Sequence, residues 1–285
     1  MEQVIREEIR RFVLESPDNR LPESDEPYFE EPLIAFASAD DPLFAEYKEI
    51  IGDFHLTPSE IMTNIYGDGV GDAKTVICWV LPITESTRKS NRREDKVPSR
   101  QWALTRAYGE RFNNLLRMYV VDMLRFVGAH AVAPLLSGMW RPAIDTKGGL
   151  ASTLSERHAA FAAGLGTFSL SDGFITERGI AHRCGSVITD VDITPSSRNH
   201  ADHLGNCLYF RDGSCGACIK RCPVGAISPD GHDKEKCKAY VYGELRGAVG
   251  ELYGVMETGC GLCQTRVPCE SRNPVRRRED PISRG

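Results

Sequence analysis

The stretch that decides how the C-terminal third of this chain is built is Cys215-Gly-Ala-Cys218-Ile-Lys-Arg-Cys222-Pro-Val-Gly-Ala-Ile. Two residues separate its first pair of cysteines and three separate the second pair, with a proline after the last. The chain has ten cysteines, and only Cys78 and Cys184 lie before residue 200. Cysteines clustered this densely, in two sets of four, are typical of metal ligands rather than of disulfides.

The spacing of this stretch matches the last three cysteines of the bacterial ferredoxin run C-x2-C-x2-C-x3-C-P. Asp212 stands where that run has its first cysteine, so Cys207 is the expected substitute across a longer loop. The second half is looser, with one C-x2-C pair between two outlying cysteines, namely Cys237, Cys260, Cys263 and Cys269.

In two-cluster ferredoxins the cysteine before the proline binds the other cluster, so the two halves exchange one ligand each. The first [4Fe–4S] cluster is therefore predicted to take Cys207, Cys215, Cys218 and Cys269. The second is predicted to take Cys222, Cys237, Cys260 and Cys263. The alternative is structural zinc held by two C-x2-C pairs, which leaves four cysteines without a role.

Length and charge set the broad class. The 285 residues suffice for about two domains of about 150 residues each, and we expect domains at residues 1–198 and 199–285. The net charge of −5 provides no basic field for nucleic acid, and the basic stretch at residues 275–280 is interpreted as a solvated tail. With no apolar run of ~18 residues and no signal-peptide core, we expect a cytoplasmic protein without a membrane partner.

Hydrophobic periodicity predicts the elements of the first domain. Helices are expected at residues 2–14, at 102–127 with Gly128 as the stop, and at 152–164 with Ser152 or Ser155 as N-cap. Strands are expected at residues 75–83, 131–136 and 184–193. The polar stretch between residues 84 and 101 is expected to form a loop or lid. Strands that alternate with helices indicate an α/β or α+β domain.

The order of these pieces resembles the epoxyqueuosine reductases and the related reductive dehalogenases. The resemblance covers roughly residues 75–270 and is carried by TVICWVLPI (75–83), by Glu156-Arg157 through Ala163-Gly-Leu-Gly166, by CGSVITDVDI (184–193) and by the cysteines. It implies an α+β protein: an N-terminal cobalamin-binding domain with a nitroreductase- or flavin-reductase-like α/β fold, then a ferredoxin-like module with two [4Fe–4S] clusters.

One segment departs from the family. Where the queuosine enzymes have an Asp-Thr-Gly-Pro motif with a proton-donating aspartate, this chain has Leu150-Ala-Ser-Thr153. Asp145 lies five residues earlier, and no counterpart of the dehalogenase tyrosine can be assigned. The resemblance therefore extends to the fold and the electron-transfer part more fully than to epoxide reduction.

The resemblance also implies where a corrinoid would bind. It would lie against the turn from Glu156 to Gly166 and the strand that begins at Cys184. The cofactor-binding candidates are Ser152, Thr153, Glu156, Arg157, Gly164, Leu165, Gly166 and Cys184, and the catalytic candidates are Asp145, Arg157 and His158. Alternatives stay open, since Arg157 can pair with a neighbouring acid, His158 can be a packing residue and Cys184 a small buried one.

The first functional hypothesis is an iron–sulfur reductase that passes electrons through both clusters to a cobalamin-type centre in the N-terminal domain. The second is a ferredoxin-type electron-transfer protein whose N-terminal domain is a docking platform without corrinoid, or carries a flavin such as FMN. Either requires an electron donor, of the flavodoxin or ferredoxin type. The substrate would be a small molecule or a modified nucleoside, and nucleic acid is the weaker partner hypothesis.

Overall fold

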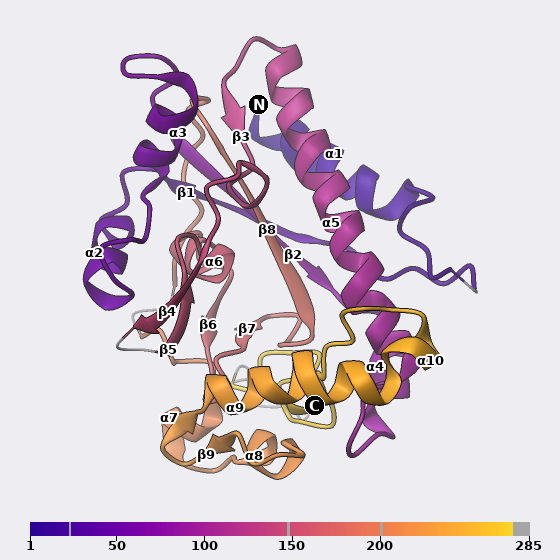
Figure 1. Ribbon diagram of the computed structural model, residues 1–285. Coiled ribbons are helices and arrows are strands. Elements are labelled where there is room, and N and C mark those ends of the chain that lie inside the picture. Colours follow the sequence, from indigo (N-terminus) through magenta and orange to yellow (C-terminus); the bar gives the residue numbers. More distant parts are fainter. Residues whose placement is uncertain (23, 147–148, 200–201, 276–285) are drawn as a thin grey trace, which may run out of the picture.

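A four-stranded antiparallel sheet lies at the centre of the computed structural model, which describes residues 1–22, 24–146, 149–199 and 202–275. The strand order is β1-β2-β8-β3 (Figure 1). The strands are β1 (Leu33–Ser38), β2 (Thr75–Pro82), β8 (His182–Thr189) and β3 (Ala131–Val132). All eight residues of β2 are buried because this strand has a neighbour on each side and helices on both faces.

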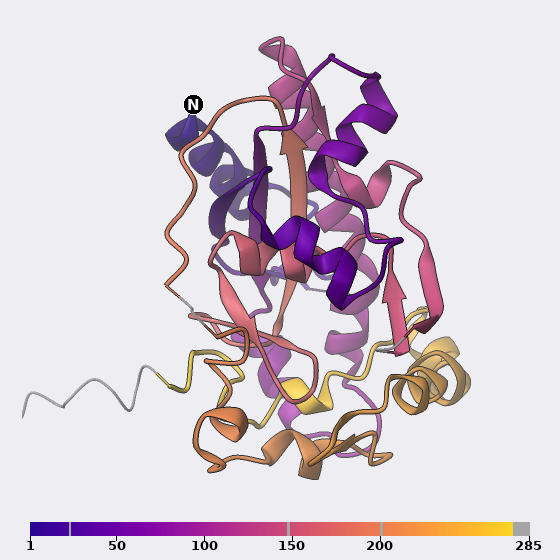
Figure 2. The same cartoon turned by 90° about the vertical axis from the view of Figure 1, so that its left-hand side faces the viewer.

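Helices cover both faces of the sheet. Ile5, Ile9 and Val13 of α1 pack with Phe112 and Leu116 of α5 in the core of one face. The other face carries three shorter helices, and Figure 2 shows two of them, α2 and α3, in front of the sheet. The bounds are α1 (Glu2–Glu15), α5 (Arg100–Phe126), α2 (Leu43–Ile50), α3 (Pro58–Tyr66) and α6 (Glu156–Ala162).

Two hairpins extend beyond the sheet toward the cysteine-rich part of the chain. They are formed by β4 (Pro142–Thr146) with β5 (Gly149–Ser152) and by β6 (Gly166–Phe168) with β7 (Phe174–Thr176). The cysteine-rich part lies at the foot of the molecule in Figure 1, and most of its elements are short. These are α7 (Leu208–Asp212), α8 (Ala217–Arg221), β9 (Ile227–Ser228), β10 (Gly231–His232) and η4 (Leu262–Gln264).

One longer helical segment runs across the foot of the molecule from Lys234 to Tyr253 (Figure 1). Its middle is wound as π-helix, so it carries four names: α9 (Lys234–Lys238), η2 (Ala239–Glu244), η3 (Arg246–Gly250) and α10 (Glu251–Tyr253). Within the described residues, no helix combines the length and the apolar character that crossing a bilayer requires.

The expectation of a loop at residues 84–101 is wrong, because helix α4 (Glu85–Arg92) occupies half of it. The helix has no apolar stripe, since the side chains that it buries are the polar Thr87, Arg88 and Asn91. Arg88 pairs with Glu270 at 3.7 Å, and Asn91 donates to Thr265 Oγ1 at 3.1 Å. The helix is stabilised by polar groups that are distant in sequence, which local hydrophobic periodicity cannot reveal.

Most of the other predicted elements are confirmed, with shifted ends. The helices at residues 2–14 and 102–127 are α1 and α5, and Gly128 follows the end of α5 with a φ of 85°. The strand expected at 131–136 ends after Val132, because Pro134 begins the 3₁₀ turn η1 (Pro134–Leu136). The helix expected at 152–164 begins only at Glu156. The fold is mixed helix and sheet, and the domain division at residue 198 stays a prediction.

Candidate functional site

The cysteines of the predicted first quartet gather around α7 and α8. Burial, followed by the neighbouring thiols of Cys207 and Cys215, raises the pKa of Cys218 to about 11. Burial also raises the pKa of Cys269, followed by Cys207, Cys218 and Cys215. A thiol feels another ionisable thiol in this way only at short range. Cys269 also packs in one cluster with Cys207 and Cys218, which precede it by more than fifty residues.

The cysteines of the predicted second quartet gather around η4. Burial raises the pKa of Cys260 to about 11, with Cys237 and Cys222 among its neighbours. Burial likewise raises the pKa of Cys263, followed by Cys260, Cys237, Cys218 and Cys222. The backbone N–H of Ala226 donates to Cys222 Sγ at 3.1 Å. Backbone donors to cysteine sulfur are a means by which proteins adjust iron–sulfur clusters.

The residues that the structure describes contain no three His, Cys, Asp or Glu side chains converging as ligands of a single metal ion. A cubane cluster spreads its four thiolates over the corners of an inorganic core, so its ligands need not converge on one point. Seven of the eight thiols are partly buried and Cys207 is buried, and one packed cluster contains cysteines of both predicted quartets. The assignment of the eight ligands stays a prediction.

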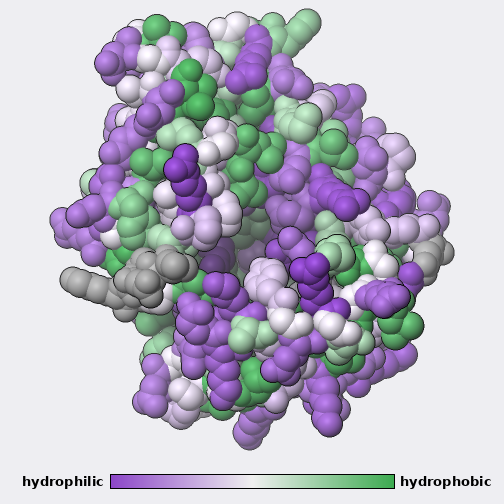
Figure 3. All heavy atoms as spheres, viewed as in Figure 1, coloured by the Kyte–Doolittle hydropathy of each residue, from purple (hydrophilic) through white to green (hydrophobic). Residues whose placement is uncertain are grey.

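The first residues of β8 lie between the sheet and the cysteine-rich part. The face of the molecule seen in Figure 1 is hollowed near its centre, above the segment that starts at α9 (Figure 3). His182, Arg183 and Cys184 are only partly exposed, and burial lowers the pKa of His182 to about 4 and raises that of Cys184 to about 12. Burial, then Arg106, lowers the pKa of Arg183 to about 10. This end of the strand is poorly hydrated but accessible.

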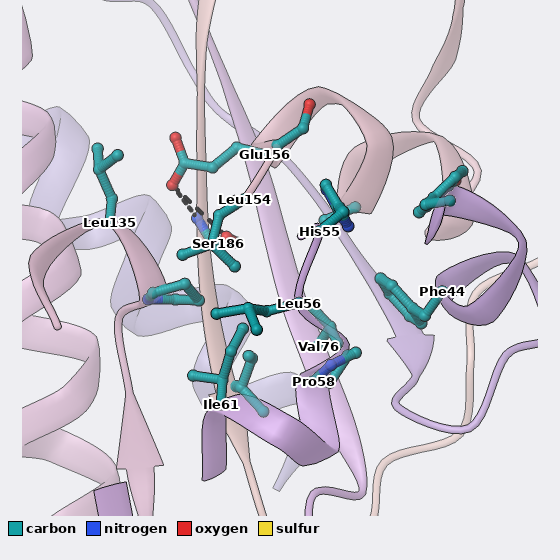
Figure 4. Close-up of a pocket in the computed structure, with 15 residues that line it drawn as sticks. Phe44, His55, Leu56, Pro58, Ile61, Val76, Leu135, Leu154, Glu156 and Ser186 are labelled. Carbon is teal, nitrogen blue, oxygen red and sulfur yellow. Dashed lines mark hydrogen bonds between the residues drawn. The ribbon is translucent and has the colours of Figure 1, made fainter. Parts of the chain in front are cut away.

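A buried ion pair lies behind this strand. Arg117 of α5 donates to both carboxylate oxygens of Glu156, at 2.9 and 2.6 Å, and to Glu110 at 2.9 Å. The N–H of Ser186 donates to Glu156 at 3.0 Å, as the dashed lines in Figure 4 show. Burial raises the pKa of Glu156, an effect that Arg117 opposes. Glu156 therefore has its full set of partners within the chain, whereas the sequence suggested a role at a cofactor.

Gly164 and Gly166, which were expected to allow close approach of a macrocycle, instead pack closely against the protein's own backbone. Gly164 has a φ of 81°, and a Cβ there would lie 2.6 Å from the carbonyl oxygen of Ser197. A Cβ on Gly166 would lie 2.3 Å from the carbonyl oxygen of Ile175, its neighbour in the β6–β7 hairpin. Leu165 is partly buried and packs against the core beneath α6. Close backbone packing explains both glycines without a ligand.

Most of the remaining predicted residues also have partners within the chain. Ser152 donates to the carbonyl of Leu154 at 2.5 Å, and Thr153 donates to that of Met139 at 2.8 Å. Arg157 is exposed, and its guanidinium donates to the backbone carbonyl of Asp172 rather than to a carboxylate. The side chain of Asp145 lies outside the described part of the structure, as do residues 276–280 of the basic tail.

His158 is a packing residue in this structure. Its ring lies against Tyr47 and Phe168, with ring centroids 4.8 and 4.7 Å away, and its Nδ1 is 2.7 Å from Ser155 Oγ. Ser155 is thus the N-cap of α6 by position, although its hydroxyl bonds the histidine rather than the backbone. Burial, then the cation of Arg157, lowers the pKa of His158 to about 3. The ring is therefore neutral at physiological pH.

We expect His158 to make the protein less stable in mild acid. Its folded-state pKa lies below the value of about 6.5 in an unfolded chain, so acid protonates the unfolded state first. The free energy of unfolding should fall by up to about 1.4 kcal/mol per pH unit below about pH 6.5 because of this residue, and the loss should be absent above that pH. Urea unfolding at pH values from about 7.5 to 5.5 should give a shallower dependence for His158→Gln. Equal slopes would show that the ring is not buried.

An apolar pocket lies between α2, α3, α6 and the sheet (Figure 4). Phe44, Leu56, Ile61 and Leu154 line it, and His55 contributes a ring that is 3% exposed. Within the described residues, neither ring nitrogen of His55 has a hydrogen-bond partner, and burial lowers its pKa to about 4. Sequence analysis missed His55, since nothing in its local pattern sets it apart.

Sequence analysis also missed Asn113 and Arg117, although a signal was present. Both lie in the middle of the amphipathic helix α5 and are spaced four residues apart, which places them on one face. Both are fully buried; Asn113 accepts from the indole of Trp79 at 2.8 Å and donates to the carbonyl of Cys184 at 2.8 Å. Two buried polar residues at this spacing indicate a polar network beneath the first residues of β8.

No protein-family model matches the chain. Among curated proteins, it is similar to epoxyqueuosine reductase of Bacillus anthracis, at 28% identity over 203 residues, which cover 69% of this chain and 48% of the relative. It is also similar to epoxyqueuosine reductase of Francisella cf. novicida, at 32% identity over 133 residues, covering 44% of this chain and 34% of the relative. The matched regions thus span about a third to a half of these relatives' lengths.

Solved structures share the fold. Epoxyqueuosine reductase from Streptococcus thermophilus superposes with a TM-score of 0.54 at 16% identity, over 96% of this chain and 68% of that one. Epoxyqueuosine reductase with an epoxyqueuosine-modified tRNA stem loop superposes with a TM-score of 0.52 at 17% identity. The match covers 94% of this chain and 65% of that one. A reductive dehalogenase associated with B12-dependent dehalogenation superposes with a TM-score of 0.54 at 14% identity. The match covers 87% of this chain and 31% of that one.

These likenesses define a class: the fold is the one shared by epoxyqueuosine reductases and reductive dehalogenases. Within that class, the sequence similarity is to the epoxyqueuosine reductases. The chain is epoxyqueuosine reductase-like, which confirms the resemblance drawn from its motifs.

Proposed function

We propose that this chain is a reductase that passes electrons through two [4Fe–4S] clusters to a corrinoid held in the hollow at the start of β8. The observation that carries the proposal is the grouping of the cysteines. Besides burial, Cys237 and Cys222 raise the pKa of Cys260, and Cys207, Cys218 and Cys215 raise that of Cys269, while Cys263 is influenced by thiols of both quartets. This exchange between the two halves is the arrangement of a two-cluster ferredoxin.

In this proposal the clusters supply one-electron transfer, and the chain supplies ligands and surroundings. The first cluster takes the thiolates around α7 and α8, and the second takes those around η4. Amide donors such as the N–H of Ala226 reach the cysteine sulfurs. Partial burial of the thiols limits the access of water and oxygen to both cores.

The second cluster is the one nearer to the hollow. The loop that carries Cys260 lies on α5, since a Cβ on Gly261 would lie 2.0 Å from the Trp102 ring and one on Gly259 would lie 2.9 Å from Arg106. Arg183 at the start of β8 in turn donates to the carbonyl of Arg106 at 3.4 Å. Electrons would therefore enter at the first cluster, leave from the second, and reach the hollow beside β8.

The corrinoid fits this chain only in part. His182, Arg183 and Cys184 offer a poorly hydrated wall with donors for amide or phosphate groups of a large cofactor. Gly164, Gly166 and Glu156, by contrast, are occupied by contacts within the chain. A bound corrinoid would supply a cobalt centre that accepts the electrons and reacts with the substrate. Support for it comes from the shared fold with a B12-dependent dehalogenase.

The substrate class that the comparisons favour is a modified nucleoside, free or within RNA, because the fold also occurs in a reductase bound to a modified tRNA stem loop. Leu150 stands where those enzymes have an acid, so the proton donor here is a different group. The electron donor would be a flavodoxin- or ferredoxin-type protein.

The second candidate is an electron-transfer protein whose N-terminal domain binds no corrinoid or binds FMN. The observation that favours it is the internal packing of Gly164 and Gly166, together with Leu150 at the position of the acid. Under this alternative the hollow would be a docking surface, or a site for a smaller flavin.

Anaerobic reconstitution separates these candidates. The purified full chain would be loaded with iron and sulfide, mixed with hydroxocobalamin or FMN, desalted, and examined by absorption spectroscopy. We expect cluster absorbance together with a retained corrinoid band. Clusters with FMN or with no organic chromophore would favour the second candidate. A colourless protein that binds zinc in place of iron would refute both.

A further inference from the structure

Arg221 occupies a central position among the cysteines of the second quartet. It precedes Cys222 directly and is 6% exposed. Its Nε donates to the carbonyls of Leu262 and Thr265, at 3.2 and 3.1 Å. These carbonyls lie in the loop that carries Cys260 and Cys263. Arg221 thus connects the segment that carries Cys222 to the loop that carries Cys260 and Cys263.

The charge of Arg221 is weakly compensated. Among the described residues, three arginines are buried: Arg88, Arg117 and Arg221. Arg88 and Arg117 have carboxylate partners that are themselves largely shielded from water. The partner of Arg221 is Asp95 at 2.9 Å, and the side chain of Asp95 is 68% exposed. Water and salt screen an exposed carboxylate much more than a buried cation, so a positive field persists inside the loop.

Such a field acts on the two redox states of a cluster unequally. Reduction adds one electron to a thiolate-bound core, without bond formation or proton transfer at the arginine. A buried positive charge nearby stabilises the more negative, reduced state more than the oxidised one. The reduction potential of a cluster depends on the net charge around it and on hydrogen bonds to its sulfurs, and Arg221 contributes to the charge.

We propose that Arg221 raises the reduction potential of the second cluster above that of the first, so that electrons run from the first cluster toward the hollow. This inference rests on the proposed function, because it requires both clusters. Arg221 is a positioning residue in this role: it holds the ligand loop and supplies charge.

The test is a redox titration of the anaerobically reconstituted full chain, with each cluster followed by its EPR signal. The second cluster is identified by its loss in Cys260→Ser. In Arg221→Gln we expect the second potential to become more negative while the first stays unchanged. The matched control is Lys220→Gln, which removes an exposed cation one residue away and should shift neither potential appreciably. An unshifted second potential in Arg221→Gln would overturn the inference.

A second variant covers the case in which Arg221→Gln does not assemble its second cluster. Asp95→Asn leaves Arg221 and its loop contacts in place but removes the counter-charge, so the second potential should move in the positive direction. No shift, or a negative one, would refute the inference even when the first variant cannot be measured. If the unmodified chain binds no iron–sulfur cluster at all, the proposed function fails instead.

Discussion

Replacing Arg117 by methionine should lower the free energy of unfolding by about 3–5 kcal/mol, because it leaves a buried carboxylate without its cation. Arg117 is fully buried and donates to Glu156, Glu110, Asn114 and the carbonyl of Cys184. Methionine fills a similar volume, so the loss comes mainly from the uncompensated charge of Glu156 and not from a cavity. The measurement is the urea midpoint of the reconstituted chain at neutral pH.

The matched control is Arg111→Met, on the same helix but exposed, which should change the free energy of unfolding by no more than about 0.5 kcal/mol. Adding Glu156→Gln to Arg117→Met should recover part of the lost stability, since the buried charge is then removed. A loss below about 1 kcal/mol in the single variant would contradict a desolvated pair.

Substitution of single cysteines by serine should divide the eight into two classes that do not follow their order along the chain. Cys222→Ser should abolish the same cluster as Cys260→Ser, although its nearest cysteine in sequence is Cys218. Cys269→Ser should abolish the same cluster as Cys215→Ser. Each variant should retain about half of the bound iron and sulfide, because one cluster of two is lost.

The readout is iron and sulfide content together with the EPR signal that disappears. Cys184→Ala serves as the control, since Cys184 lies outside both groups of thiols and should leave the iron content unchanged. Loss of the Cys215-dependent signal in Cys222→Ser would refute the exchange of ligands between the two halves. If the variants lose bound zinc and none of them contains iron, the clusters are refuted altogether.

Regular elements with strong local patterns could be predicted from the sequence. The apolar run of β2 and the long periodic stretch of α5 are each decided by residues close together in the chain. Helix α4 could not be predicted from the sequence, because its buried face is polar. Its partners, Glu270 and Thr265, lie more than 170 residues away in the chain. Its stability is a property of the folded chain.

The candidate site shows the same division. The cysteine spacing and the resemblance to the epoxyqueuosine reductases could be taken from the sequence, since ligand type and spacing are local properties. The roles of Gly164, Gly166 and Glu156 could not be taken from the sequence, because each depends on a contact with another segment. Gly164 packs against Ser197, Gly166 packs against Ile175, and Glu156 pairs with Arg117. Motif residues that suggested a cofactor proved to be held by the protein's own backbone and side chains.

The sequence by itself determined that the C-terminal third carries eight cysteines in a ferredoxin-like pattern, and that the chain resembles reductases of one class. Only the tertiary structure placed Arg221 within the loop of Cys260 and Cys263. The physical reason is that spacing along a chain defines which ligands are available. The charge and hydration around those ligands depend on segments that meet only when the chain folds.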